Sequence, residues 1–144
     1  MQLTRLDSIS RNAGEAFRHA TWRQRRRAVL AACEFAVRRS ELNENIVAEA
    51  LALLRAEKAP DITVRQRLEE LAARLDDQYF DASKEPDEAL GPDGLGFFSK
   101  ARAAAALAYA FGDPERIHEA IYEAIATTND QEELLKTILA TLHE

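Results

Sequence analysis

The apolar positions of this chain recur at intervals of three and four residues over most of its length. Such a pattern places apolar side chains on one face of an amphipathic α-helix. Residues 3–19 show it first, although Asn12 and Gly14 weaken the helix and the segment could break there. The apolar positions of this segment are Leu3, Leu6, Ile9, Ala13 and Phe17.

A capping box predicts the start of the second helix. Thr21 and Gln24 have the right types and spacing for the hydroxyl and the amide each to satisfy a free backbone N–H. The helix is expected to run to about residue 39. Its apolar positions are Trp22, Val29, Leu30, Cys33, Ala36 and Val37.

Two further helices follow on either side of Pro60. Asn43 is a good cap for a helix that runs to about residue 58. The helix is expected to end there because Pro60 disfavours helical backbone in the residue before it. Asp61 or Thr63 then caps a fourth helix, since both have oxygen-bearing side chains suited to that position.

Residues 79–96 break the helical pattern. They contain two prolines and three glycines in 18 residues, so we expect an irregular loop there. The loop is either a plain surface connection or a segment that contacts a partner. In the second case its aromatic anchors would be Tyr79, Phe80, Phe97 and Phe98.

The segment from about 96 to 111 is rich in alanine and apolar on nearly every side, which is typical of a buried helix. Gly112 ends it, and Asp113 with Pro114 begins a helix over 114–127. A last helix over 131–142 is capped by Asn129 or Asp130. We therefore expect an all-α, single-domain bundle over 1–144, with six or seven mostly antiparallel helices around the central alanine-rich helix.

Composition places this bundle in a reducing compartment. The chain has one cysteine, Cys33, which lies in an apolar helical pattern and is expected to be a buried structural thiol. No apolar run approaches the length that spans a bilayer, and the N-terminus lacks the apolar core of a signal peptide. We expect a cytoplasmic protein with no membrane contact.

Charge is distributed unevenly along the chain. Residues 1–40 hold nine arginines and three acidic residues, whereas residues 41–144 hold ten basic and 22 acidic residues. The formal net charge of the whole chain is −6. Uneven charge bears on association with partners rather than on fold, so it favours a binding function.

Residue patterns that carry chemistry are scarce. Glu115 and His118 have the spacing at which one helix can offer two ligands to an iron, but a di-iron site needs a second such pair and two more glutamates. The glycines at 91–96 are not followed by the Lys-Ser/Thr of a phosphate loop. No catalytic residue, cofactor or metal is expected, and the chain is not expected to be an enzyme.

Two acidic groups are candidate binding residues for a basic partner, although each is also compatible with a plain solvated surface. One is a stripe at intervals of four residues on a predicted helix, with a tyrosine beside it, a residue type enriched at interface hot spots. The other lies on the side of the 79–96 loop. The two groups are Glu115, Glu119, Tyr122 and Glu123, and Asp76, Asp77, Asp81 and Asp87.

A basic cluster supplies the main alternative. Arginines bind phosphate largely through charge, so a nucleic-acid contact is possible here, but the arginines could instead pair with the acidic remainder of the chain. The cluster comprises Arg23, Arg25, Arg26 and Arg27, with Arg38 and Arg39 further along.

The run ARAAAALAYAF followed by IHEAIYEA, residues 101–124, resembles the helical cores of small bacterial immunity proteins of polymorphic-toxin systems. The resemblance implies a cytoplasmic protein that binds and neutralises one cognate toxin. The resulting first hypothesis is a non-catalytic protein-binding protein with an acidic face for a basic partner. The alternatives are a nucleic-acid-associated or regulatory protein using Arg23–Arg27 and a self-associating structural subunit; the sequence leaves the oligomeric state open.

Overall fold

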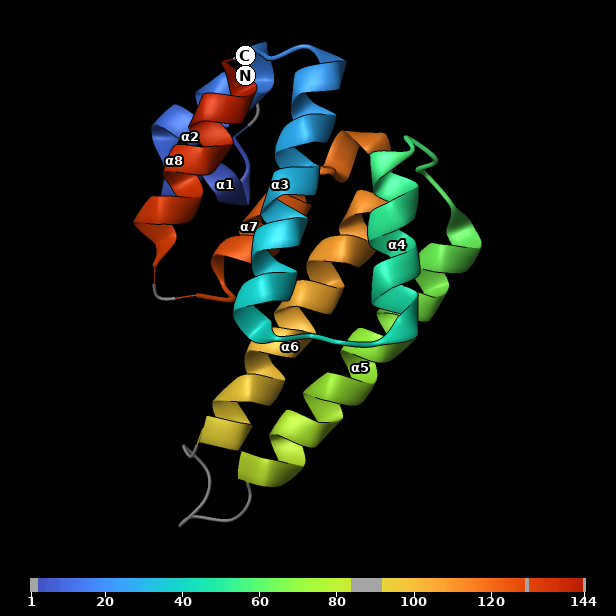
Figure 1. Ribbon diagram of the computed structural model, residues 1–144. Helices are drawn as coiled ribbons and strands as arrows, with labels where there is room; N and C mark the ends of the chain where they lie inside the picture. Colours follow the sequence, from blue (N-terminus) through green and yellow to red (C-terminus); the bar gives the residue numbers. More distant parts are fainter. Residues whose placement is uncertain (1–2, 84–91, 129, 144) are drawn as a thin grey trace.

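Helices make up most of the computed structural model, which describes residues 3–83, 92–128 and 130–143. Over these residues the chain forms eight α-helices and one 3-10 turn, with no strand, and this confirms the predicted all-α bundle (Figure 1). The elements are α1 (Arg5–Ile9), α2 (Arg11–His19), α3 (Trp22–Ser40), α4 (Asn45–Arg55), α5 (Ile62–Ser83), α6 (Pro92–Ala110), η1 (Pro114–Arg116), α7 (His118–Ile125) and α8 (Gln131–Leu142).

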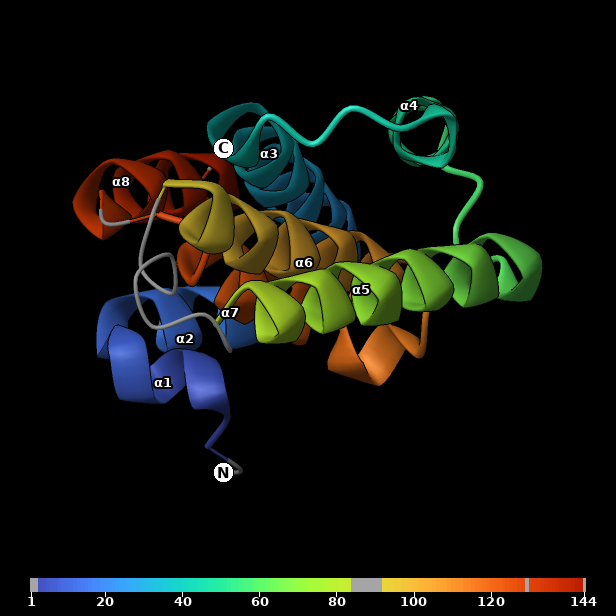
Figure 2. The same cartoon turned by 90° about the horizontal axis from the view of Figure 1, so that it is seen from below.

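Helix α6 is the centre of the bundle, as its composition predicts. It packs against α3, α5 and α7, and Figure 2 shows it between these neighbours. Its alanines allow the surrounding helices to approach closely, because a methyl group is the whole side chain. The fully buried positions of this helix are Ala101, Ala103, Ala104, Ala106 and Leu107.

Helices α5 and α6 form an antiparallel pair whose ends project beyond the other helices (Figure 1). The prediction of an irregular loop over 79–96 was wrong at both ends, because α5 continues to Ser83 and α6 begins at Pro92, and residues 84–91 of that prediction lie outside the described residues. Proline is tolerated in the first turn of a helix, where its missing N–H has no partner to lose. The Tyr79 and Phe98 rings pack together across the pair, with centroids 5.5 Å apart.

The first predicted helix is two helices, and the break lies at Ser10. Its backbone is extended (φ −149°, ψ 112°), and its side chain accepts a hydrogen bond from the Ala13 N–H to cap α2. Gly14 does not break the helix but lets α1 fold back onto α2. A Cβ added at Gly14 would lie 2.7 Å from the carboxyl carbon of Asp7.

Other boundaries follow the caps. The capping box of Thr21 and Gln24 is present at the start of α3. Asp61, rather than Thr63, caps α5 by accepting from the Val64 N–H at 3.1 Å. Asn43 does not cap α4, whose N-cap position is occupied by Glu44.

The predicted helix over 114–127 is shorter and begins irregularly. Asp113 caps the 3-10 turn η1 by accepting from the Glu115 N–H, and α7 starts only at His118. Asp130 caps α8 through the Glu133 N–H. The short α7 therefore lies against α6, α3 and α1, with most of its side chains buried.

Candidate functional site

Two of the three glutamates in the predicted acidic stripe are buried on α7. Glu119 and Glu123 are each 6% exposed, and Tyr122 is half-buried. Buried carboxylates are stable in the charged form only when cations or hydrogen-bond donors compensate them. Both carboxylates have such partners, and these partners come from two distant parts of the chain.

The first partner is Arg5 on α1. Its Nε donates to the Glu119 carboxylate at 2.8 Å, and its Nη2 lies 3.6 Å from Glu123 Oε1. Its guanidinium also lies over the Tyr122 ring, 4.1 Å from the centroid. The hydrogen bond to Glu119 raises the pKa of Arg5 against the opposing effect of desolvation. Arg5 therefore fixes the short helix α1 to α7.

The second partner is Arg102 on α6. Its Nη1 donates to Glu123 at 3.0 Å, and its Nη2 donates to both oxygens of Asp76 at 3.0 and 3.1 Å. His118 Nε2 lies 3.1 Å from Glu119 Oε1 at the other end. The result is a row of alternating charges, Asp76–Arg102–Glu123–Arg5–Glu119, which we call the charge chain. It ties α5, α6, α7 and α1 together.

The structure thus brings together four of the eight predicted binding residues, namely Asp76, Glu119, Tyr122 and Glu123, but around partners of this same chain. The other described ones lie on the surface. Glu115 is exposed in η1, whereas Asp77 and Asp81 are exposed on α5. Asp87 lies outside the described residues.

A groove of about 500 Å³ lies between α5, α6 and α7, and both acidic and basic residues line it. Four alanines line it, together with Asp76, Arg102 and Glu123 of the charge chain. Arg116 stacks over Tyr109 at 5.6 Å and adds a cation to the same groove. Both signs of charge therefore line this groove, and Arg65, Asp76, Arg102 and Glu123 are among the lining residues that form ion pairs.

The outward face of α5 differs, because two of its carboxylates, Glu70 and Asp77, form no ion pair within the described part of the chain. Arg65, Arg67 and Arg74 pair with Glu69, Glu49 and Glu44, respectively. Glu70 and Asp77 are exposed and form no ion pair with any residue that the structure describes. Glu70 was not among the predicted residues; the signal that could have found it is its seven-residue spacing from Asp77.

Two members of the basic cluster point into the protein. Arg25 donates to the carbonyl oxygens of Phe17 and Arg18, at 2.8 and 2.6 Å. Arg26 donates to the Ala59 carbonyl oxygen at 3.1 Å and lies over the Trp22 ring. These donors join segments of the fold through backbone carbonyl oxygens rather than through the acidic side chains expected from the sequence as internal partners.

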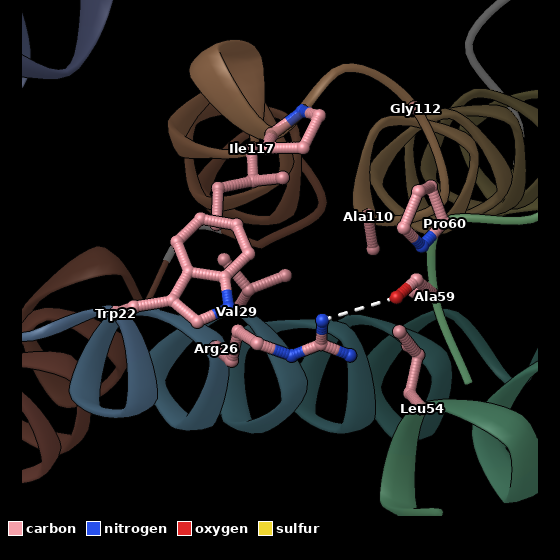
Figure 3. Close-up of a pocket in the computed structure, with 10 residues that line it drawn as sticks. Trp22, Arg26, Val29, Leu54, Ala59, Pro60, Ala110, Gly112 and Ile117 are labelled. Atoms are coloured by element: carbon pink, nitrogen blue, oxygen red, sulfur yellow. Dashed lines mark hydrogen bonds between the residues drawn. The ribbon is translucent and has the colours of Figure 1, made fainter. Parts of the chain in front are cut away.

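The hollow beside Trp22 is a packing seam rather than a ligand site. Figure 3 shows Trp22 against Ile117 and Arg26 reaching across to Ala59. Its free volume is about 20 Å³, and that much space holds about one water molecule. No substrate of ordinary size fits there.

The remaining chemical candidates in the described part of the chain are metal ligands and the thiol of Cys33. There, no group of three or more His, Cys, Asp or Glu residues is placed to hold a metal ion. Cys33 is fully buried, and burial raises the pKa of its thiol to about 12, with Glu34 adding to the effect. A thiol in this state is a poor nucleophile because the thiolate is the reactive form.

Comparisons with known proteins add no family. Neither the family models nor the curated proteins nor the solved structures contain a match to this chain. Among the described residues, no helix has the length and apolar character needed to cross a membrane.

Proposed function

We propose that this chain is a non-catalytic protein-binding protein whose partner is a basic protein. The observation that carries the proposal is the exposed surface of α5, where Glu70 and Asp77 have no cation among the described residues. Carboxylates exposed in this way can accept cationic side chains of a partner without breaking ion pairs of the fold.

The charge of the whole molecule favours the same kind of partner. The chain has a formal net charge of −6. Several basic residues of the N-terminal part are used internally, for example Arg5 by Glu119 and Arg39 by Asp130 and Glu133. An acidic protein attracts an oppositely charged partner over a Debye length, which speeds encounter more than it strengthens the final contact.

The most specific form of the proposal is an immunity protein that neutralises a basic cognate toxin. Its support is the resemblance of residues 101–124 to such proteins. A nuclease toxin is often basic because it binds phosphate. An acidic blocker is then electrostatically suited to its active site.

Affinity capture tests the proposal directly. The full chain, tagged and purified, is used as bait in a lysate of the cells that produce it, at salt concentrations of about 50 and 500 mM, at which screening differs strongly. We expect one stoichiometric protein with a high isoelectric point, retained at low salt and released at high salt.

Other results would contradict this proposal and favour an alternative. Retention of nucleic acid would favour a contact through Arg23 and its neighbours. Recovery of the bait alone, with a mass that rises with concentration, would favour a self-associating subunit. The immunity form fails by itself if the captured protein is harmless when expressed without this chain.

A further inference from the structure

We infer that the outward face of α5 docks a basic amphipathic helix of the partner. The inference rests on the proposed function and specifies its interface. We define the α5 face by six exposed residues that share one side of the helix. They are Ile62, Gln66, Glu70, Ala73, Asp77 and Phe80.

The spacing of these residues makes the α5 face a continuous strip along the helix. They follow one another at intervals of four and three, the spacing by which a helix presents one seam to another helix. At about 100° per residue, all six fall within an arc of about 80°. Ile62 and Phe80 are separated by five helical turns, about 27 Å along the axis, and therefore point the same way.

The side chains of the α5 face indicate which kind of partner helix would bind there. The two ends of the face are apolar, with Ile62 62% exposed and Phe80 60% exposed. Its middle holds Glu70 and Asp77, about 10 Å apart on the helix, around the small side chain of Ala73. The complementary segment is a helix with apolar side chains near both ends and lysine or arginine between them.

Cations of α5 itself do not interfere with such a helix. Arg67 and Arg74 lie on the flank toward α4, where they pair with Glu49 and Glu44 at 3.2 and 3.0 Å. Arg65 pairs with Glu69 at 3.3 Å. The α5 face therefore presents its negative charge without a competing positive one from this helix.

A second copy of the chain does not suit this face. Two α5 faces brought together would place Glu70 and Asp77 of one copy near those of the other, and like charges at an interface are unfavourable.

The area of the α5 face limits the affinity that a docked helix can reach. A strip about 27 Å long and about 10 Å wide covers about 300 Å², below the roughly 800 Å² per partner of a stable interface. We therefore expect the contact with the partner helix to be salt-dependent and of modest affinity, or to form one part of a larger interface.

A defined peptide tests the α5 face without requiring knowledge of the partner. The probe is a capped synthetic helix of about 20 residues, which matches the length of the α5 face. It carries leucines opposite Ile62 and Phe80 and lysines opposite Glu70 and Asp77. Titrated into the isotope-labelled full chain, it should shift the NMR signals of α5 amides, and the same peptide with glutamates in place of the lysines should not.

Matched variants distinguish a specific effect of the α5 face from a general effect of net charge. Glu70→Lys with Asp77→Lys should weaken binding of the peptide by about tenfold or more, since two attractions become repulsions. The control, Glu15→Lys with Glu132→Lys, changes the net charge equally at two exposed residues of α2 and α8 that form no ion pair with a described residue. It should bind nearly as well as the unaltered chain, and both variants should keep the helical circular dichroism spectrum.

The inference is overturned if the peptide does not bind, if its shifts lie on other helices, or if the control weakens binding as much as the α5 variant. Its failure is distinguishable from failure of the proposed function. If the lysate experiment captures a basic protein and Glu70→Lys with Asp77→Lys captures it equally well, the partner exists and docks elsewhere. If no basic protein is captured, the proposed function itself fails.

Discussion

Single residues show where close packing, rather than helix propensity, sets stability. Gly14 lies in the middle of α2, where alanine would ordinarily stabilise a helix by about 1 kcal/mol. Here an added Cβ would collide with the Asp7 side chain, and the Asp7 Cα would lie only 3.3 Å away. The glycine is therefore required by the approach of α1.

We predict that Gly14→Ala lowers the free energy of unfolding by about 1–2 kcal/mol, because forced overpacking outweighs the gain in propensity. Gly96→Ala is the matched control, since a Cβ there meets no described atom within 4 Å. The control should leave stability unchanged or raise it by up to about 1 kcal/mol. Urea unfolding measures both, and a Gly14→Ala protein more stable than the unaltered chain would contradict the packing account.

The hydrogen bonds of the Asp7 carboxylate make part of the folding stability depend on pH. The Thr4 backbone N–H donates to Asp7 at 2.7 Å, and Arg18 donates at 2.7 Å, and these bonds lower the pKa of Asp7 in the folded state. The unfolded chain then takes up the proton first as the pH falls. The stabilisation from Asp7 is therefore complete above its unfolded pKa of about 4 and is lost as the pH falls toward the lower folded value.

We predict that the stability difference between the unaltered chain and Asp7→Asn is constant above about pH 5 and shrinks below about pH 4. Chemical denaturation at a series of pH values measures this difference, in which other carboxylates largely cancel. A difference that stays constant down to about pH 2.5, below the range in which aspartate ordinarily titrates, would show that the Asp7 pKa is not lowered.

At the scale of elements, the charge chain holds α1, α5, α6 and α7 in place. Arg102 is one of its two cations, and the Glu123 side chain that it neutralises is only 8% exposed, whereas the Asp76 side chain is 48% exposed. Loss of Arg102 would leave Glu123 with Arg5 at 3.6 Å as its remaining cation. Asp76 would regain water at little cost.

We predict that Arg102→Ala lowers the free energy of unfolding by about 2–3 kcal/mol, because it leaves a buried charge poorly compensated. Arg74→Ala is the control: it removes an exposed pair with Glu44 and should cost less than about 1 kcal/mol. Adding Glu123→Gln to Arg102→Ala should restore part of the loss. Equal effects of Arg102→Ala and Arg74→Ala would contradict a structural role for the charge chain.

The elements also show what local sequence can predict. The capping box of Thr21 and Gln24 and the burial of the alanine-rich α6 are encoded within a few residues, and both predictions are confirmed. The burial of Glu119 depends on Arg5, which is 114 residues away in the sequence. No helical period could indicate that partner, so the stripe on α7 had the pattern of a solvated or partner-binding face.

At the scale of the whole molecule, internal pairing decides which charges remain for a partner. Among the predicted acidic residues, Asp76, Glu119 and Glu123 belong to the charge chain, whereas Asp77 and Asp81 belong to the exposed surface of α5. Only the fold distinguishes these two groups. In the proposed function, the first group stabilises the bundle and the second speeds encounter with a basic protein.

The salt dependence of association with the captured protein is the most direct test of this account. Stopped-flow or surface-binding kinetics should show an association rate constant that falls by about tenfold or more between 50 and 500 mM salt, with a much smaller change in dissociation. Glu70→Lys with Asp77→Lys should flatten this dependence, and Glu15→Lys with Glu132→Lys should flatten it less. An association rate that is independent of salt would contradict an acidic binding surface as the basis of function.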